Sequence, residues 1–357
     1  DEPRTMTVDA NALRTLSRLV PDNPIFNLII AYKKSDLLVR QFLDIDLSPE
    51  GKVHTSYNIT GASSDDEEDT KKTKRSFGRW SSSASIILPY GSGNLQNIPP
   101  EARKMYRADP GWKIVQADYS QAEAVVMAHL TGDQKLVKMF RDSFGLSRTE
   151  KKSYDVHKLT FAQMAGIDIS QVTPEQRTAG KTVRHATNYS AGPQVLANRL
   201  GIKLGDAKQL IELYHRANPQ LRIWYSQVQQ ELKRSRVLTN LLGRKHKFLD
   251  RWGDSLFRSA YSYIPQSTVG DLLNTALLRL YNKLPSLSFD ITILLQLHDA
   301  IYTMVEEQYV MDTVKIMREC MLIPLYYANE EFMIDVDFAV GDSWAEGKEL
   351  DISWRYK

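Results

Sequence analysis

The chain has 357 residues, 42% hydrophobic and 25% charged, which is the composition of a globular protein with two or three subdomains and ample core. Its formal net charge is only +3, which excludes a uniformly basic surface, so any binding of nucleic acid must come from local patches. The single cysteine, Cys320, excludes an intrachain disulfide and a cysteine-cluster metal site, and it is expected to be a buried structural thiol.

No apolar stretch approaches the length of a transmembrane span, and the opening residues DEPRTMTVDA lack the basic and apolar regions of a signal peptide. The sequence therefore predicts a soluble, cytoplasmic protein with no membrane partner.

The first predicted element is a helical region over residues 10 to 45. Its apolar residues follow the three-four spacing of an amphipathic helix, which predicts packing in a core. These residues are Ile25, Leu28, Ile29 and Tyr32. Residues 61 to 83 change character, because the acidic run DDEED stands beside the basic run KKTKR among serines. This composition predicts a charged surface loop.

A short buried strand is predicted from Trp112 to Ala117, followed by a helix that ends at Gly132, so Asp118 lies at the exit of the strand. Helical patterns then dominate from about Lys135 to Asn282. They are broken at the segment LLGRKHKF, residues 241 to 248, which is expected to form a turn or a short hairpin.

One helix is predicted from Pro174 to about Ala191. Thr173 suits the N-cap, Gln176 completes a capping-box spacing, and Gly192 followed by proline is expected to end the helix.

The most informative pattern lies on this helix. Arg177, Lys181, His185 and Tyr189 are spaced four apart and therefore share one face of the helix. Two cations near the positive end of the helix dipole favour an anion, and the two rings favour a ring-bearing ligand. The alternative is a solvated basic face.

Near the end of the chain, ITILLQLHDAIYTMV predicts a β-hairpin over about 291 to 305 with His298 and Asp299 at its tip. Asp118 and Asp299 thus both stand at strand ends that could be neighbours in one sheet. Such a pair could hold Mg²⁺ for phosphoryl transfer. Taken singly, Asp118 could be a helix cap and Asp299 an ordinary turn residue.

Three motifs occur in order: DYSQAE at 118 to 123, RTAGKTVRHATNY at 177 to 189, and QLHDA at 296 to 300. Together they resemble the signature motifs of the family A (Pol I-like) DNA polymerases, with a wording closer to phage-type members. Further matches, among them GRWSSS at 78 to 83 and IPQST at 264 to 268, extend the resemblance over most of the chain.

The resemblance implies an α+β fold, the right-hand polymerase fold, with an antiparallel β-sheet palm, helical fingers and a partial helical thumb. It divides the chain into a partial thumb at 1–60, a charged loop or insertion and entry to the palm at 61–83, palm at 84–134, fingers at 135–235, and palm again at 236–357.

The resemblance also implies roles for site residues. Asp118 and Asp299 look like the metal-binding catalytic aspartates, with the Tyr119 backbone carbonyl as a further metal ligand, for two Mg²⁺ ions that Mn²⁺ could replace. Arg177 and Lys181 match positions that hold the β- and γ-phosphates, and Lys181 matches a proton donor to the departing pyrophosphate.

Other matched positions concern the nucleotide and the DNA. Glu123 resembles the steric gate against a ribose 2′-hydroxyl, and Tyr189 resembles the fingers tyrosine near the templating base. The remaining nucleotide-binding positions are Gln121, His157 and His185. The positions that match contacts with primer, template or minor groove are Arg79, Arg244, Gln266 and His298.

Four positions depart from the family pattern. His185 stands where Phe or Tyr is usual, Ala300 replaces an acid, Val125 replaces an arginine, and Ser190 replaces a common glycine. Since the aspartates and the Arg/Lys pair remain, activity is expected to persist, with fidelity, sugar discrimination or metal preference as the properties open to change.

The implied function is template-directed addition of deoxynucleotides to a primer 3′ end, with no proofreading domain in this chain. Expected partners are primer-template DNA and dNTPs; an N-terminal thumb or exonuclease segment and a processivity factor are further candidates. Two alternatives stay open: a single-subunit RNA polymerase, which Glu123 and the wording DYSQAE disfavour, and a non-catalytic nucleic-acid-binding subunit with the same fold.

Overall fold

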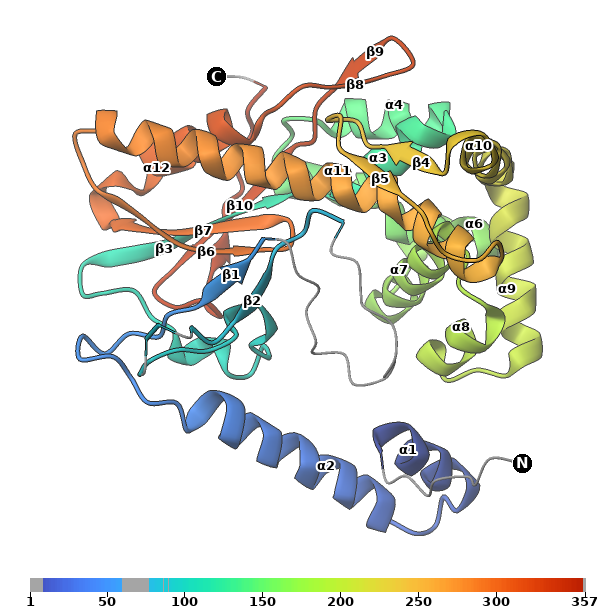
Figure 1. The fold of residues 1–357 in the computed structure, drawn as a ribbon, viewed down its shortest axis with the longest axis horizontal. Coiled ribbons are helices and arrows are strands. Elements are labelled where there is room, and N and C mark those ends of the chain that lie inside the picture. Colours follow the sequence, from blue (N-terminus) through green and yellow to red (C-terminus); the bar gives the residue numbers. More distant parts are fainter. Residues whose placement is uncertain (1–8, 60–76, 86, 89, 356–357) are drawn as a thin grey trace.

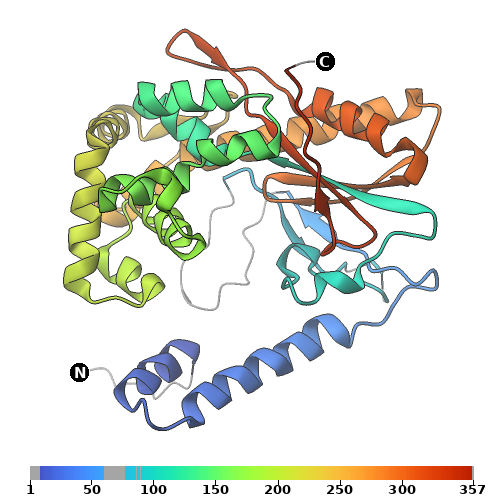
Figure 2. The same ribbon diagram turned by 180° about the vertical axis from the view of Figure 1, so that it is seen from behind.

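The computed structural model describes residues 9–59, 77–85, 87–88 and 90–355, and Figures 1 and 2 show the chain from opposite sides. Its α-helices are α1 (Ala10–Leu19), α2 (Ile25–Leu38), α3 (Ala122–Thr131), α4 (Gln134–Ser143), α5 (Arg148–Lys151), α6 (Val156–Ala165), α7 (Pro174–Asn188), α8 (Pro193–Leu200), α9 (Leu204–Ala217), α10 (Pro219–Ser235), α11 (Asp254–Lys283) and α12 (Val310–Met321). Its strands are β1 (Ser56–Asn58), β2 (Ser81–Ser83), β3 (Trp112–Tyr119), β4 (Val237–Thr239), β5 (Lys245–Lys247), β6 (Ile291–Leu297), β7 (Ala300–Glu306), β8 (Leu325–Tyr327), β9 (Glu330–Phe332), β10 (Val336–Gly341) and β11 (Lys348–Glu349). The α+β class is confirmed.

The main sheet has five strands in the order β11-β10-β3-β7-β6, and every neighbouring pair is antiparallel. The strand predicted over 112–117 is β3, at the centre of the sheet, and the predicted hairpin is β6–β7. Because β7 pairs directly with β3, the segments that carry Asp118 and Asp299 are neighbours, as expected.

The two faces of the main sheet have different covers. Val115 and Ala117 of β3 belong to the larger core, which α11 and α12 complete where they lie across one face of the sheet (Figure 1). Side chains alternate along a strand, so Asp118 points to the opposite face. There Ile114 and Ala300 belong to a smaller apolar cluster. Asp118 therefore stands on the face that α11 and α12 leave uncovered.

Helices α6 to α9 gather beside the sheet, on the right of Figure 1. Gly180, in the middle of α7, allows α6 to approach closely, because a Cβ there would stand 2.3 Å from the backbone oxygen of His157. The segment 241–248 lies in the turn and second strand of the β4–β5 hairpin, as the sequence indicated.

Helix α7 begins as predicted and ends earlier. Thr173 and Gln176 form the capping box, with the Gln176 N–H donating to Thr173 Oγ1 at 3.3 Å. The helix ends at Asn188 rather than near Ala191, because Ser190 adopts a left-handed φ of 55° and the Ala191 N–H returns to the carbonyl of Ala186 at 2.9 Å. A serine thus occupies a conformation that favours glycine.

The helical region predicted over residues 10 to 45 is confirmed, but it is interrupted and the core packing expected of it is wrong. Pro21 and Pro24 separate α1 from α2, since proline disfavours helix at the preceding residue, and a π-helical turn over Val39–Leu43 follows. No residue of α2 whose side chain the structure describes is buried, so the expected core packing is absent. The exposed fractions are 50% for Ile25, 63% for Leu28 and 68% for Tyr32. Both helices lie along the bottom of Figure 1.

Most of the predicted charged loop, residues 61–76, lies outside the described residues. Its last residues differ from the prediction, because 81–83 form β2, which pairs with β1. Cys320 is 5% exposed, as expected for a structural thiol. Among the described residues, none of the helices is both long and apolar enough to span a membrane.

Candidate active site

The two predicted aspartates meet at one end of the main sheet. Asp118 pairs with Ala300 in the β3–β7 ladder, and the Tyr119 N–H donates to the backbone oxygen of Asp299 at 3.1 Å. His298, with a φ of 57°, makes the tight β6–β7 turn that brings Asp299 beside β3. Backbone pairing therefore fixes the position of both acids.

The pair is electrostatically strained. Burial, and after it the charge of Asp299, raises the pKa of Asp118 to about 8. Burial also raises the pKa of Asp299, against the opposing charge of Arg79. Asp118 Oδ1 is buried and has no hydrogen-bond partner among the described residues. Two carboxylates that repel each other, one of which has an oxygen that no donor reaches among the described residues, fit a divalent cation.

The set of possible metal ligands is small. In the part of the chain that the structure describes, no three His, Cys, Asp or Glu side chains converge as a metal site. The phenol of Tyr119 is buried and donates to the Met321 carbonyl at 2.7 Å, so only the backbone of Tyr119 could serve a cation. A metal here would depend on Asp118, Asp299 and non-carboxylate oxygens.

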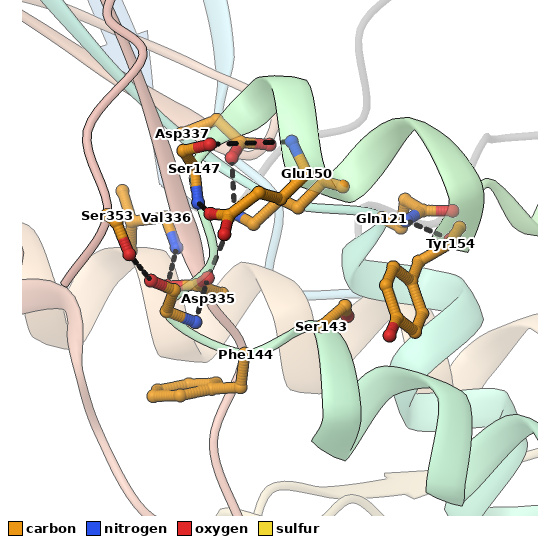
Figure 3. Close-up of polar contacts among 12 residues, drawn as sticks. Gln121, Ser143, Phe144, Ser147, Glu150, Tyr154, Asp335, Val336, Asp337 and Ser353 are labelled. Carbon is orange, nitrogen blue, oxygen red and sulfur yellow. Dashed lines mark hydrogen bonds and ion pairs between the residues drawn. The ribbon is translucent and has the colours of Figure 1, made fainter. Parts of the chain in front are cut away.

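The sequence reasoning missed a third carboxylate, Asp337. It stands directly opposite Asp118 in the β3–β10 ladder, and its charge also raises the pKa of Asp118. Lys151 of α5 binds both Asp337 and Asp335, with Nζ to oxygen distances of 2.7 and 2.9 Å. Figure 3 shows the two aspartates beside the start of α5. The alternation in IDVDF, residues 334–338, predicts a strand with both acids on one face, and this pattern could have identified them as site residues.

The cationic half of the site is α7. Arg177 Nε donates to Asp155 Oδ2 at 2.5 Å, and Asp155 also caps α6 by accepting the N–H groups of His157 and Lys158 at 2.9 and 3.1 Å. The charge of Lys181 opposes the pKa rise of both Asp118 and Asp299, although its own side chain is exposed. Asp155, which the sequence reasoning also missed, orients one of the two cations.

Gln121 and His157 lie between the two halves. Gln121 adopts a left-handed φ of 52°, and its side chain binds the backbone of the segment before α6. Its Nε2 donates to the Tyr154 carbonyl at 3.4 Å, drawn in Figure 3, and its Oε1 accepts the Val156 N–H at 3.0 Å. Burial lowers the pKa of His157 to about 4, so its imidazole is neutral near pH 7. The Gln121 side chain therefore takes part in holding α6 near β3.

Glu123 is the centre of a polar cluster beside Asp299. The Tyr189 hydroxyl donates to one carboxylate oxygen of Glu123, and Arg79 Nη2 forms an ion pair with the other. His185 Nε2 lies 3.9 Å from Glu123, and the His185 ring stands edge-on to Tyr189 with centroids 5.1 Å apart. Burial lowers the pKa of His185. The structure thus joins the residues predicted to face the sugar and the base.

Two of the four predicted DNA contacts, Arg79 and Arg244, lie close together beside α11, because a Cβ on Gly270 would meet Arg79 at 3.4 Å and a Cβ on Gly78 would meet Arg244 Nε at 2.9 Å. Arg79 and His298 lie near Asp299, since the charge of Arg79 affects the pKa of both. Arg244 is held by Asp271, with Nε to carboxylate distances of 2.9 and 2.8 Å. Gln266 lies on α11 and is partly exposed.

Three of the four residues that depart from the family pattern lie in surroundings that suit their residue type or conformation. Ala300 is 3% exposed within the smaller apolar cluster, where an acid would be buried. Val125 belongs to the larger core. Ser190, as described, closes α7 in a left-handed conformation.

Residues 2–346 match the model of the family described as DNA polymerase family A. The chain is 29% identical to "DNA polymerase I, thermostable" of Thermus filiformis over 95% of this chain and 38% of that protein, and 29% identical to "DNA polymerase I" of Chloroflexus aurantiacus over 96% and 34%. It therefore spans a little over a third of the length of these relatives. The structure titled "POL domain of Pol1 from M. smegmatis complex with DNA primer-template and dNTP" superposes with a TM-score of 0.77 at 24% identity, covering 97% of this chain and 58% of that one. This likeness confirms the polymerase fold. The chain belongs to DNA polymerase family A.

Proposed function

We propose that this chain is the polymerase core of a template-directed DNA polymerase, which adds deoxynucleotides to a primer 3′ end. The observation that carries the proposal is the pair Asp118 and Asp299, held side by side by the β3–β7 ladder and within electrostatic reach of Lys181. The relatives named above, which are DNA polymerases, support the same activity.

Asp118 and Asp299, with the Tyr119 carbonyl, would hold two Mg²⁺ ions, or Mn²⁺ in their place. When bound, such ions lower the pKa of an attacking hydroxyl and stabilise negative charge on the transferred phosphoryl group. Arg177 and Lys181 would bind the outer phosphates, and Lys181 would give a proton to the departing pyrophosphate. Asp155 orients Arg177 through Nε, which leaves the two terminal nitrogens of the guanidinium for an anion.

The cluster around Glu123 would read the sugar. Arg79 and Tyr189 restrain the two carboxylate oxygens of Glu123, so an added 2′-hydroxyl would meet a side chain that cannot easily move aside. Tyr189 and His185 would contact the nucleotide or the templating base, and His157 and Gln121 would support the phosphate end. Arg79, Arg244, Gln266 and His298 would contact primer or template, where such contacts sense duplex shape more than sequence.

The proposal assigns each part of the chain to a region of the polymerase fold. Residues 1–60 are the partial thumb, 61–83 the charged loop and entry to the palm, 84–134 and 236–357 the palm, and 135–235 the fingers. Primer-template DNA and dNTPs are the proposed partners. An N-terminal thumb or exonuclease segment and a processivity factor are candidates for further ones.

Primer extension with Mg²⁺ and dNTPs, NTPs or ddNTPs tests the proposal. We expect extension with dNTPs, and a loss of at least about 1,000-fold, roughly 4 kcal/mol of barrier, in Asp118→Ala and Asp299→Ala. Asp342→Ala is the matched control, because Asp342 is a carboxylate next to the same sheet that is paired with Lys113 at 2.8 Å.

Three outcomes would contradict it. If the chain fails to extend a primer, even after the N-terminal region of one of the relatives has been fused to it, the catalytic assignment is refuted. Preference for NTPs would favour a single-subunit RNA polymerase. Unchanged activity in both alanine variants would favour a non-catalytic nucleic-acid-binding subunit.

A further inference from the structure

Lys151 is a nearly buried cation that the proposed reaction does not use. It ends α5, which starts with a capping box between Ser147 and Glu150 (Figure 3). Only 14% of the Lys151 side chain is exposed. Burial alone would lower the pKa of Lys151, but the charges of Asp335 and Asp337 raise it above its usual value. Lys151 is therefore a fixed positive charge between α5 and β10.

The two carboxylates that Lys151 binds differ in their other partners. Asp335 accepts the Gly145 N–H at 2.8 Å and lies 3.6 Å from Arg318 Nη2, so it is satisfied without Lys151. Asp337 has no other ion pair or side-chain hydrogen bond recorded within the described ranges. The charge of Asp337 is thus balanced mainly by Lys151.

Asp337 lies next to the proposed metal site. It is the direct partner of Asp118 in the antiparallel β3–β10 ladder, so the two side chains share one face with their Cβ atoms about 5 Å apart. On the other side of Asp118 the paired residue is Ala300, which brings no charge. Asp337 is therefore the acid paired directly with Asp118.

We propose that Lys151 and Asp337 set the affinity of the Asp118–Asp299 pair for divalent cations, acting as positioning residues through charge rather than as ligands. The proposal rests on the proposed function, because it concerns the same metal site. Asp337 adds negative charge beside Asp118 and attracts a cation. Lys151 offsets that charge and holds the Asp337 carboxylate toward its own ammonium group. No three-carboxylate site forms among the described residues, which agrees with an effect through the field rather than by coordination.

The test is Mn²⁺ binding to the metal-free full chain, followed by electron paramagnetic resonance of free Mn²⁺. Asp337→Asn is expected to bind Mn²⁺ about tenfold more weakly and Lys151→Gln about tenfold more tightly, because one charge near a divalent ion changes its binding by roughly that factor in a half-screened site. The double variant restores the net charge and is expected to lie within about twofold of the parent.

Lys113 offers a matched control. It bridges Asp342 and Glu307 at 2.8 and 3.3 Å on the same strand as Asp118, but it is five residues away, about 17 Å along the strand. That separation exceeds the screening length of roughly 8 Å at physiological salt. Lys113→Gln and Asp342→Asn are therefore expected to leave Mn²⁺ binding unchanged.

If the Lys151–Asp337 ion pair only stabilises the packing of α5 on β10, a different result is expected. The melting temperature then falls in both Lys151→Gln and Asp337→Asn without opposite shifts in Mn²⁺ affinity, and shifts in the same direction, or none, would overturn the proposal. If Lys151→Gln does not fold, Asp337→Glu replaces it: the glutamate keeps the charge and should bind Mn²⁺ as the parent does, and equal affinities in Asp337→Asn and Asp337→Glu would also overturn it. Failure of primer extension in the parent chain would instead refute the polymerase activity, whatever the Mn²⁺ result.

Discussion

The acidic and cationic halves of the site are held in different ways. Asp118 and Asp299 are positioned by the backbone ladder of β3 and β7, and Asp118 Oδ1 has no hydrogen-bond donor among the described residues. Arg177 and the cluster around Glu123 are positioned by side chains, through Asp155, Arg79 and Tyr189. The acids are therefore fixed before any ligand arrives, whereas the cations are held by contacts that a ligand can replace.

The strongest test of the cationic half is Arg177. We expect Arg177→Ala to lower kcat/KM for dNTP incorporation about 100-fold, because a charge-assisted contact with phosphate is lost. Asp155→Asn should cost about tenfold, since Arg177 is retained but loses its orienting charge. Single-nucleotide incorporation kinetics would measure both. Arg222→Ala, which breaks a 2.9 Å pair with Glu212 on the exposed side of α10, should have no effect. Equal losses in Arg177→Ala and Arg222→Ala would show that side-chain placement is not specific to the site.

The cluster around Glu123 gives the next effect. Glu123→Ala should reduce the preference for dNTPs over NTPs by roughly tenfold or more, because the restrained carboxylate no longer opposes the 2′-hydroxyl. Arg79→Lys keeps the charge but loses the planar fork, so a smaller reduction is expected. Competition between dNTPs and NTPs measures the ratio, with Arg234→Lys, paired with Glu231, as the control. An unchanged ratio in Glu123→Ala would separate this cluster from sugar selection.

The acidic half is tested by stability. The folded pKa of Asp118, about 8, lies above the value of roughly 3.9 expected in the unfolded chain, so ionisation is disfavoured in the fold. The free energy of unfolding should therefore fall as pH rises from about 4 to about 8, and Asp118→Asn should remove that loss. Thermal melts of the metal-free chain should show the variant higher by a few degrees above pH 8 and little changed near pH 4. Lys113 lowers the pKa of Asp342, so Asp342→Asn should give no such rise. If the melting temperatures of the parent and Asp118→Asn differ by the same amount at every pH, the ionisation of Asp118 does not destabilise the fold.

The smallest expected effect is at His185. Replacement by Tyr or Phe should change the ratio of dideoxy- to deoxynucleotide incorporation severalfold, because a ring of different polarity would stand beside Tyr189 and Glu123. Primer extension with mixed ddNTPs and dNTPs measures the ratio. Identical ratios in the three proteins would mean that His185 does not face the sugar.

The sequence predicted those parts of the site that depend on local rules. The capping box at Thr173, the exit of β3 at Asp118 and the β6–β7 turn all follow from short patterns, and each is confirmed. Partners that depend on long-range register were missed. Asp337 meets Asp118 only because β10 pairs with β3, and Asp155 meets Arg177 only because α6 packs on α7.

Two further differences show the limits of periodicity. The apolar spacing in α2 carries no information on what covers these side chains, and the predicted core packing was wrong. Gly192 predicted the end of α7, yet the helix ends at Asn188 and Ser190 has a left-handed φ. A serine does not by itself predict that conformation. The roles of the individual site residues and the phage-type wording stay predictions.

Gly180 bears on which sequences this fold can accept. In most helices a change from glycine to alanine stabilises by roughly 0.5–1 kcal/mol, and a library screened for robustness would favour it. Here an added methyl group would stand 2.3 Å from the His157 carbonyl oxygen and 3.2 Å from Phe161, so α6 and α7 would have to separate. In a saturation library, position 180 should therefore accept glycine alone, although it lies in the middle of a regular helix and touches neither acid of the site.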